Sequence, residues 1–339
     1  MILAHGRRLG QLLLVAAIGL VAATGAGAPP EAAAAAAKKK LAMILPGSIQ
    51  DADFNTVGYL ALQELGKTYD LQVSHSESVA VADAERITRE YLTAGYDIVI
   101  FHGGQYAAIV NKLAPAFPNA QFVNNTSGRV PNAPPNVWIL GRRWYQGFYV
   151  LGALGALSTK GHKVGFIGGV RIPDVIASTN SVQQALKDYN PKAQLIYNHI
   201  GDFNDPVKAR QTTEAQVNAG VDFIVNFINL GIYGVAEAVK AQPKPVLLTT
   251  FVTEKWELAP RHLVGSLLAD YPKAYREIAG KVLQGERTGY WEMRPGNGFE
   301  LSDLRNIPPE VAAKVKAIFA DVVSGKVQIA EVTDRIVAP

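Results

Sequence analysis

A short apolar strand, a glycine-containing turn and a long helix follow one another twice in this 339-residue chain, which limits the possible folds more than any other feature. In Lys163–Tyr189, an apolar run ends at Gly168–Gly169 and Pro173 marks the start of a helix. The first half opens in the same way, with an apolar run at Leu41–Leu45 and a helix closed by Gly66. Short runs that are apolar throughout suit parallel strands covered on both faces. The repeat therefore predicts two similar α/β lobes.

Strands and helices continue to alternate along the chain, which favours parallel sheets. The later copy of Asp97–Phe101 is Asp222–Phe227, again after a helix and a glycine. Open sheets of this kind bind ligands at the carboxyl ends of their strands, and clefts favour domain interfaces. We therefore expect a ligand between the lobes. The other predicted strands are Leu71–His75, Gln121–Asn124, Val137–Leu140, Gln194–Ile200, Val246–Thr250 and His262–Leu268.

Residues 1–37 have the pattern of a secretory signal peptide, with Arg7 and Arg8 before an apolar stretch at Leu12–Ala23. Small residues follow, and cleavage within Ala32–Ala37 is expected. A membrane anchor that is retained is the alternative. The chain has no cysteine, which excludes disulfides, thiolate metal sites and a lipid-acceptor cysteine. These features predict a periplasmic protein that is not lipid-anchored.

Composition argues for a folded protein that does not bind nucleic acid. Hydrophobic residues make up 48% of the chain and charged residues 18%, which is enough for sizeable cores. The formal net charge is +4, and the basic run Lys38–Lys40 is best explained as a solvated entry to the first strand. No nucleic-acid partner is therefore expected.

No catalytic or metal-binding constellation is recognisable in the sequence. It contains no glycine-flanked serine elbow, Walker loop, complete dinucleotide fingerprint or histidine pair at metal-ligand spacing. Asp51 and Asp53 lie in the first cleft loop, but Asp53 is equally well explained as a helix cap. His102 alone sits at a predicted cleft position, either as a ligand contact or as a solvated loop residue. We therefore expect a protein that is not an enzyme and that uses neither a metal nor a cofactor.

Aromatic and amide residues recur where strands are predicted to end. Aromatic rings stack and amides offer donors and acceptors, which together suit a flat heteroaromatic ligand. For any single ring a core position is the simpler interpretation, and only the recurrence favours a binding site. The candidate ligand-binding residues are Asp51, Phe54, Asn55, His102, Tyr106, Trp144, Phe203, Phe227, Asn229 and Phe251.

Several motifs, in order and spacing, resemble one family over nearly all of the chain after the predicted leader. The sequence is similar to the basic-membrane-protein (BMP) or purine-nucleoside-receptor-like group of substrate-binding proteins of ABC importers, which have the two-lobed type I periplasmic binding fold. The motifs are GSIQDADFN at Gly47–Asn55, YDIVIFHGG at Tyr96–Gly104, the region around Gln146–Gly147, KVGFIGG at Lys163–Gly169, GDFNDPVKA at Gly201–Ala209 and NAGVDFI at Asn218–Ile224.

The resemblance implies a role for some of the candidate residues. Asp51, Phe54 and Asn55 match the family's first ligand loop, in which an aromatic ring stacks on the base and polar neighbours contact its edge. The segments His102–Tyr106 and Phe227–Gly231 match ligand-loop positions without the usual residues.

Two departures from the family pattern bear on the ligand. Nucleoside-binding members resemble one another in an aspartate and a lysine that hold the ribose hydroxyls. Here those places read Thr249–Thr250–Phe251 and Ala269–Asp270. Ribose recognition is therefore in doubt, and we expect a free purine base or a similar flat heterocycle.

The resemblance also implies lobes built from separate parts of the chain and joined by hinge crossovers. These crossovers are expected near Ser158–Lys163 and His262–Tyr271. The predicted domains are the signal peptide at 1–37, an N-terminal lobe of 38–160 plus about 266–295, and a C-terminal lobe of 161–265 plus about 296–339.

The predicted function is capture of a small molecule without chemistry, by an exported monomer that delivers it to an ABC permease in the inner membrane. A purine nucleoside-binding protein of the same family is the first alternative. A sensory ligand-binding protein would use the same fold. An exported nucleoside hydrolase would need an acid, base or nucleophile in the cleft, and the sequence shows no constellation of such groups.

Overall fold

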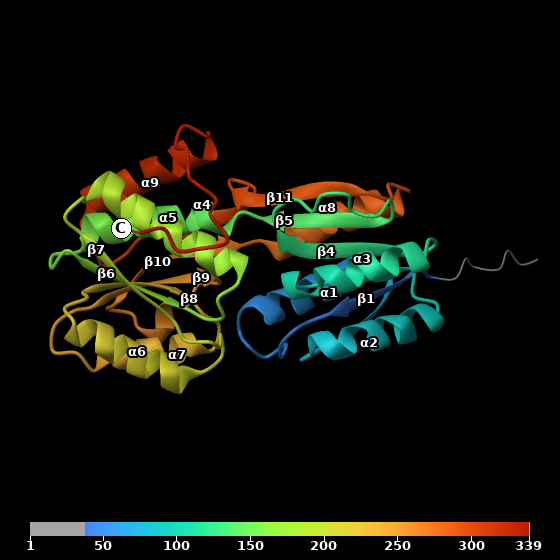
Figure 1. Ribbon diagram of the computed structural model, residues 1–339, viewed down its shortest axis with the longest axis horizontal. Helices are drawn as coiled ribbons and strands as arrows, with labels where there is room; N and C mark the ends of the chain where they lie inside the picture. The colour runs from blue at the N-terminus through green and yellow to red at the C-terminus, as the bar shows by residue number, and fades with distance from the viewer. Residues whose placement is uncertain (1–37, 339) are drawn as a thin grey trace, which may run out of the picture. The chain divides into compact units, whose positions relative to one another are not determined.

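The computed structural model describes residues 38–338, which fold into two lobes, and the predicted signal peptide at 1–37 lies outside that range. The first lobe is a sheet of parallel strands in the order β2-β1-β3-β4-β5-β11, with helices on both faces (Figure 1). Its strands are β1 (Lys40–Ile44), β2 (Gln72–Ser76), β3 (Ile98–Phe101), β4 (Gln121–Ser127), β5 (Val137–Arg142) and β11 (Gly289–Pro295). Its helices are α1 (Phe54–Thr68), α2 (Val81–Thr93), the short η1 (Gly104–Tyr106), α3 (Ala107–Ala116) and α8 (Tyr271–Leu283).

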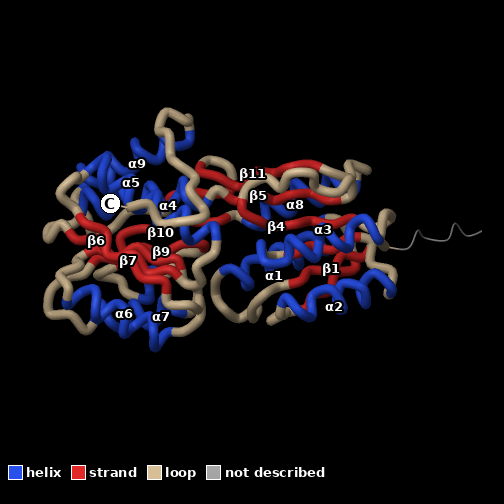
Figure 2. Tube along the Cα trace, viewed as in Figure 1, coloured by secondary structure: helices blue, strands red, loops and turns tan. Residues whose placement is uncertain are grey.

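The second lobe repeats this architecture in the order β12-β10-β9-β8-β6-β7, with β12 antiparallel to β10. Figure 2 shows its strands between helices on two sides. Its strands are β6 (Lys163–Gly168), β7 (Gln194–His199), β8 (Phe223–Phe227), β9 (Leu247–Val252), β10 (Leu263–Ala269) and β12 (Gly298–Leu301). Its helices are α4 (Trp144–Ser158), α5 (Pro173–Tyr189), α6 (Pro206–Asn218), α7 (Gly231–Lys240), the short η2 (Trp256–Leu258) and α9 (Pro309–Val323).

Strand β3 shows why an uninterrupted apolar run forms a central strand here. Successive side chains of a strand point to opposite faces of the sheet. Ile98 and Ile100 lie in the core that contains α1 and α8, whereas Val99 and Phe101 lie in the core that contains α2 and α3. Every position is therefore buried. The α/β class and the two similar lobes predicted from these runs are confirmed.

Helix α4 packs in a different lobe from the one that the sequence suggested. The prediction placed residues up to 160 in the N-terminal lobe, but α4 packs against α5 and α9. The chain thus leaves the first sheet at Arg142, the last residue of β5, and not near Ser158–Lys163. Residues on all sides of α4 are buried, so its pattern carries no preference for either sheet. Strands β11 and β12 were not predicted from the sequence.

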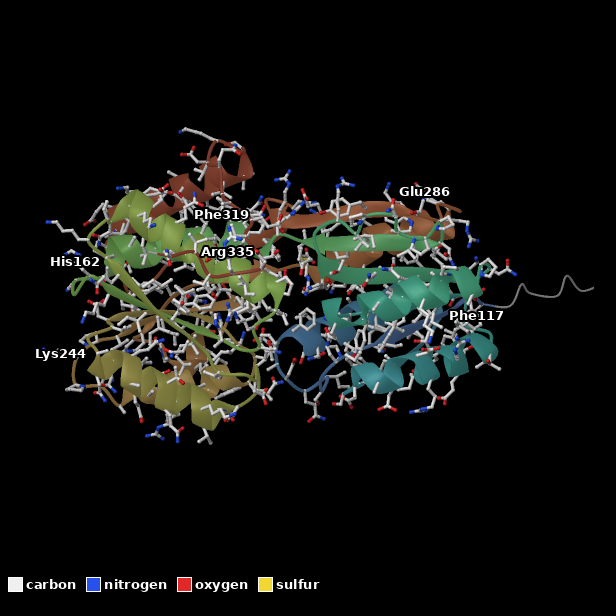
Figure 3. The ribbon with its side chains drawn as sticks, in the orientation of Figure 1. Phe117, His162, Lys244, Glu286, Phe319 and Arg335 are labelled. Carbon is white, nitrogen blue, oxygen red and sulfur yellow. The ribbon has the colours of Figure 1, made fainter. Side chains whose placement is uncertain are left out.

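The segment that follows α9 returns to the cleft along α5. We define residues 326–337 as the C-terminal segment. Asn180 Nδ2 donates to the carbonyl oxygens of Val332 (3.0 Å) and Arg335 (2.8 Å), and its Oδ1 accepts from the Val337 N–H (2.8 Å). Arg335 is labelled in Figure 3, where the segment crosses in front of α5.

Candidate functional site

A cavity of about 950 Å³ lies between the lobes, at the carboxyl ends of strands from both sheets. Each parallel strand is followed by a loop and the start of a helix, and their backbone N–H groups point to this edge of the sheet. In α/β proteins ligands commonly bind at this edge. From the first lobe the cavity is lined by Pro46, Gly47, Phe54, Asn55, Gly103–Gln105 and Thr126–Arg129. The lobe junction and the second lobe contribute Arg142–Trp144, Val170, Ile172–Asp174, Phe203, Asn204, Phe227, Asn229 and Phe251, and the C-terminal segment adds Glu331 and Thr333.

The loop before α1 is held by Asp51 rather than by Asp53. The buried Asp51 carboxylate accepts hydrogen bonds from the backbone N–H groups of Asp53 (2.9 Å), Asn55 (3.0 Å) and Thr56 (3.0 Å). These are the unpaired donors that begin every helix. Asp53 occupies the cap position, but its side chain makes no capping hydrogen bond. Asp51 therefore orients the start of α1, and with it Phe54.

The amide of Asn55 is occupied by the protein itself. Its Nδ2 donates to Asp51 (2.7 Å) and its Oδ1 accepts from the Gly47 N–H (3.0 Å). Asn55 thus ties two loops together at the cavity wall, with part of its hydrogen-bonding capacity already used.

His102 forms a support behind the ring of Phe54. The two rings stack with centroids 4.0 Å apart and an interplanar angle of 21°. His102 is fully buried, with Nε2 2.7 Å from the Phe54 carbonyl oxygen and Nδ1 2.6 Å from the Tyr275 hydroxyl. Since a carbonyl only accepts, this network assigns the proton to Nε2 and makes Nδ1 the acceptor from Tyr275. A Cβ at Gly58 would lie 2.7 Å from His102 Cδ2, so glycine allows α1 to approach the ring.

Burial keeps His102 neutral. It lowers the pKa of the imidazole to about 3, against which the hydrogen bond to the Phe54 carbonyl has a smaller raising effect. A neutral ring with both nitrogens engaged is a positioning group for Phe54.

The second lobe supplies a cluster of aromatic rings to the same cavity. Phe227 and Phe251 pack edge to face at 4.7 Å, and Trp144 lies 5.7 Å and 5.5 Å from them. Phe203 borders this cluster, with its ring 6.4 Å from that of Phe227. A Cβ at position 169 would lie 2.2 Å from the Phe203 ring, so Gly169 is required for this placement.

A buried ion pair also lines the cavity. Arg142, at the end of β5, lies with Nη2 2.9 Å from Oδ2 of Asp174 in the first turn of α5. Each residue is only 6% exposed. The pair joins the first sheet to the second lobe.

A second ion pair joins the lobes beside the cavity. Lys255 Nζ lies 3.1 Å from Oδ1 of Asp53, and both side chains are largely buried. Burial raises the pKa of Asp53 to about 7, because it outweighs the lowering effect of Lys255. Next to it, the Thr253 hydroxyl donates to the Ala52 carbonyl at 3.3 Å.

The C-terminal segment forms one wall of the cavity through Glu331 and Thr333. Glu331 accepts a hydrogen bond from Arg143 at 2.6 Å, and Arg143 also donates to Glu292 of β11 at 2.8 Å. Arg143 therefore ties this segment to the first sheet.

The structure brings seven of the ten candidate residues to the cavity and places three elsewhere. The residues at the cavity are Phe54, Asn55, Trp144, Phe203, Phe227, Asn229 and Phe251. Asp51 and His102 lie behind the wall and orient Phe54. Tyr106 is fully buried in the core under α3, and its hydroxyl donates to the Val79 carbonyl at 2.6 Å.

Sequence analysis missed the charged residues at the cavity. Arg142 follows a predicted strand of the first half and Asp174 follows one of the second half. Their position after a strand was the signal that could have placed them at the cleft. Glu331 and the uncharged Thr333 had no such signal, because they lie in an irregular segment after the last helix.

Within residues 38–338, no group of three or more His, Cys, Asp or Glu side chains could hold a metal ion. Over the same range, no helix has the length and apolar character needed to cross a membrane.

The comparisons with known proteins agree with this geometry. A sequence profile described as Bmp, ABC transporter substrate-binding protein PnrA-like, matches residues 38–293. This chain belongs to that family. The resemblance noted from the motifs is thereby confirmed, and the C-terminal segment lies beyond the matched residues.

Relatives of this Bmp-family protein extend over most of its length. A purine-binding protein from Brucella abortus is 25% identical over 260 residues, which cover 76% of this chain and 72% of the relative. Among solved structures, a solute-binding protein of an ABC transporter system from Aeropyrum pernix superposes with a TM-score of 0.77 at 17% identity, covering 87% of this chain and 94% of that one. One from Conexibacter woesei gives 0.69 at 23% identity, covering 86% and 99%.

These structural matches confirm the type I periplasmic binding fold. The matched family is described as substrate-binding proteins, and the two solved structures named above are described as solute-binding proteins of ABC transporter systems.

Proposed function

We propose that this protein is the exported substrate-binding protein of an ABC importer and that it captures a purine base or a related flat heterocycle between its lobes. The observation that carries the proposal is the set of rings at one cavity: Phe54, backed by His102, on the first lobe, and Trp144, Phe227 and Phe251 on the second. Aromatic rings stack on flat heterocycles, each contributing about 1 kcal/mol beyond the buried area. The purine-binding relative from Brucella abortus supports the same ligand class.

The residues that replace the family's ribose-binding charges support a base rather than a nucleoside. Thr249 and Thr250 are buried in β9, and the Thr250 hydroxyl lies 2.5 Å from that of Ser266. The Asp270 side chain caps α8 by accepting the Lys273 N–H at 2.8 Å. Among the described residues, none of these three side chains lines the cavity, whereas the neighbouring Phe251 does line it and has no polar group for a ribose hydroxyl. The size of the cavity alone admits a nucleoside, which remains the second candidate.

The mechanism is ligand capture by closure of the two lobes. Only a closed arrangement lets both aromatic walls contact one ligand, so the ligand shifts an equilibrium toward closure. We expect micromolar or tighter affinity, about −8 kcal/mol. The closed monomer would then be presented to a permease in the inner membrane, after export to the periplasm and removal of the predicted leader.

The test is to purify the protein natively, denature it and identify the released small molecule by ultraviolet absorbance and mass spectrometry. A purine base supports the proposal. A nucleoside would keep the transport function and overturn the choice of ligand. A protein that releases nothing and shows no thermal shift with purine bases or nucleosides would overturn the ligand class.

A further inference from the structure

We infer that Arg142 and Asp174 together contact one edge of the ligand and select a heterocycle that presents a carbonyl oxygen beside a ring N–H, such as a 6-oxopurine, over its 6-amino counterpart. This inference rests on the proposed function and names the chemical subclass of its ligand.

The pair has the position that such a role requires. Both side chains line the cavity, although each is 6% exposed. A ligand that reaches these two side chains displaces water from them. A polar group that the ligand leaves without a hydrogen-bond partner cannot then be satisfied by water, which costs binding free energy.

Arg142 supplies the donor. Its Nε donates to the Thr126 carbonyl oxygen at 3.4 Å and its Nη2 lies 2.9 Å from Asp174, which uses part of its five N–H groups. Burial lowers the pKa of Arg142, but the Asp174 carboxylate raises it and the net direction is upward, so the guanidinium is charged. A charged guanidinium only donates, and the ligand atom facing it must therefore be an acceptor.

Asp174 supplies the acceptor. It lies in the first turn of the 17-residue helix α5, directly after Pro173, where the helix dipole favours a carboxylate. An ionised carboxylate has about four lone-pair sites, and the contact with Arg142 leaves others for a ligand N–H.

The aromatic walls bring a flat ligand to this pair. The Arg142 guanidinium carbon lies 5.8 Å from the centroid of the Phe54 ring, and Trp144 is two residues further along the chain. A heterocycle stacked on Phe54 therefore has an edge within reach of a donor and an acceptor that are neighbours. Because the pair spans both lobes, binding this edge also favours closure.

The complementary ligand edge is a carbonyl oxygen next to a ring N–H. In a 6-aminopurine both groups are reversed: an amino group meets the guanidinium and a ring lone pair meets the carboxylate. A site built to hydrogen-bond its ligand rejects such an analogue, since its buried partners are left unpaired.

The first test uses the unmodified full chain, freed of any bound ligand, and titrates it with hypoxanthine, adenine and unsubstituted purine. We expect hypoxanthine to bind at least about tenfold more tightly than adenine, with purine between them. Equal binding of the three, or a preference for adenine, would overturn this inference and leave the proposed function intact. Failure of all three to bind, and of nucleosides as well, would overturn both.

The second test uses Asp174→Asn, which keeps the shape of the side chain and removes its charge. We expect the ratio of hypoxanthine to adenine affinity to fall to within about threefold of unity, because an amide tolerates both edges. Arg142→Lys should also reduce this ratio. A merely structural role would weaken all three ligands alike and leave the ratio unchanged, which would contradict the inference.

Arg210→Gln is the matched control. Arg210 is an exposed residue of α6 that does not line this cavity, and its guanidinium pairs with Glu214 at 2.9 Å. We expect its removal to leave the ligand ratio unchanged. If the variants at 142 and 174 do not fold, the ligand series with the unmodified chain still decides the question.

Discussion

The residues behind the Phe54 ring determine where that ring lies. His102 contacts it face to face, while Asp51 holds the loop from which it emerges. Neither residue lines the cavity. Their expected effect on binding is therefore indirect, through the orientation of a single ring.

Replacement of His102 by alanine should weaken both ligand binding and stability. The change removes the acceptor of the Tyr275 hydroxyl proton and the side-chain donor to the Phe54 carbonyl, although Asn125 still donates to Tyr275, and it opens a space behind the ring. We expect a loss of roughly 2–4 kcal/mol in the free energy of unfolding and about tenfold weaker purine binding, measured by chemical denaturation and titration. His75→Ala, on the edge strand β2, is the control and should leave binding unchanged. Wild-type affinity in the variant at 102 would show that Phe54 needs no support.

Asp53 and His102 should have opposite effects on the pH dependence of stability. The pKa of Asp53 rises from 3.8 to about 7 on folding, chiefly through burial. The folded state then holds the extra proton, so this contribution is complete below about pH 3.8 and is lost as the pH rises through 7. The pKa of His102 falls from 6.5 to about 3, again through burial, so its contribution is present above about pH 6.5 and is lost on acidification.

Between about pH 4 and 6.5, a rise in pH lowers the free energy of unfolding through Asp53 and raises it through His102. Asp53→Asn removes the contribution of Asp53. We expect the free energy of unfolding of this variant, measured by denaturant titration at pH 4 to 8, to increase relative to wild type as the pH rises to 7. Parallel curves for the two proteins would mean that Asp53 has an ordinary pKa in the folded state.

At the scale of elements, the C-terminal segment acts as part of the site although it has no regular structure. It is fixed to α5 by Asn180 and Gln184, and to the lobe junction by Arg143. Through Glu331 it reaches the cavity. An irregular segment held by side-chain hydrogen bonds can be loosened without disturbing either sheet.

Asn180→Ala should detach this segment. It removes the hydrogen bonds to Val332, Arg335 and Val337. We expect faster proteolysis after α9 and severalfold weaker ligand binding, because one cavity wall is lost. Lys187→Ala, an exposed change on the same helix, is the control. Unchanged proteolysis together with unchanged binding would contradict a role for the segment.

At the scale of the whole molecule, the lobes are joined by Arg142–Asp174 and Asp53–Lys255. A buried ion pair contributes little net stability, but loss of one partner leaves a buried charge and costs roughly 3–5 kcal/mol. The lobes can avoid this cost by separating, because separation returns the charge to water.

Lys255→Met should therefore shift the ligand-free protein toward an open form, because the closed form must then either keep the Asp53 carboxylate buried without its partner or take up a proton there. We expect a larger radius of gyration in small-angle X-ray scattering and at least about tenfold weaker ligand binding. Adding Asp53→Asn removes the carboxylate that has lost its partner, and it should partly restore the wild-type radius of gyration and the wild-type affinity. Lys208→Met, in an exposed pair with Asp205, is the control. An unchanged radius in the Lys255 variant would show that other contacts hold the lobes together.

The amino-acid sequence by itself determined the α/β class, the two lobes and the family, because these depend on local information. The runs Leu41–Leu45 and Ile98–Phe101 are apolar at every position, and a strand buried on both faces requires that pattern. The recurrence of rings after strands likewise placed Phe54, Trp144, Phe227 and Phe251 at the cavity. Each such inference uses neighbouring residues only.

Only the tertiary structure decided which lobe holds α4, where the C-terminal segment lies and which charges meet. Helix α4 is buried on all sides, so no stripe indicates its partner. Arg142 and Asp174 belong to different lobes, and Glu331 reaches Arg143 across most of the chain. A charged side chain in a sequence shows neither its burial nor its partner, because both depend on how distant elements pack.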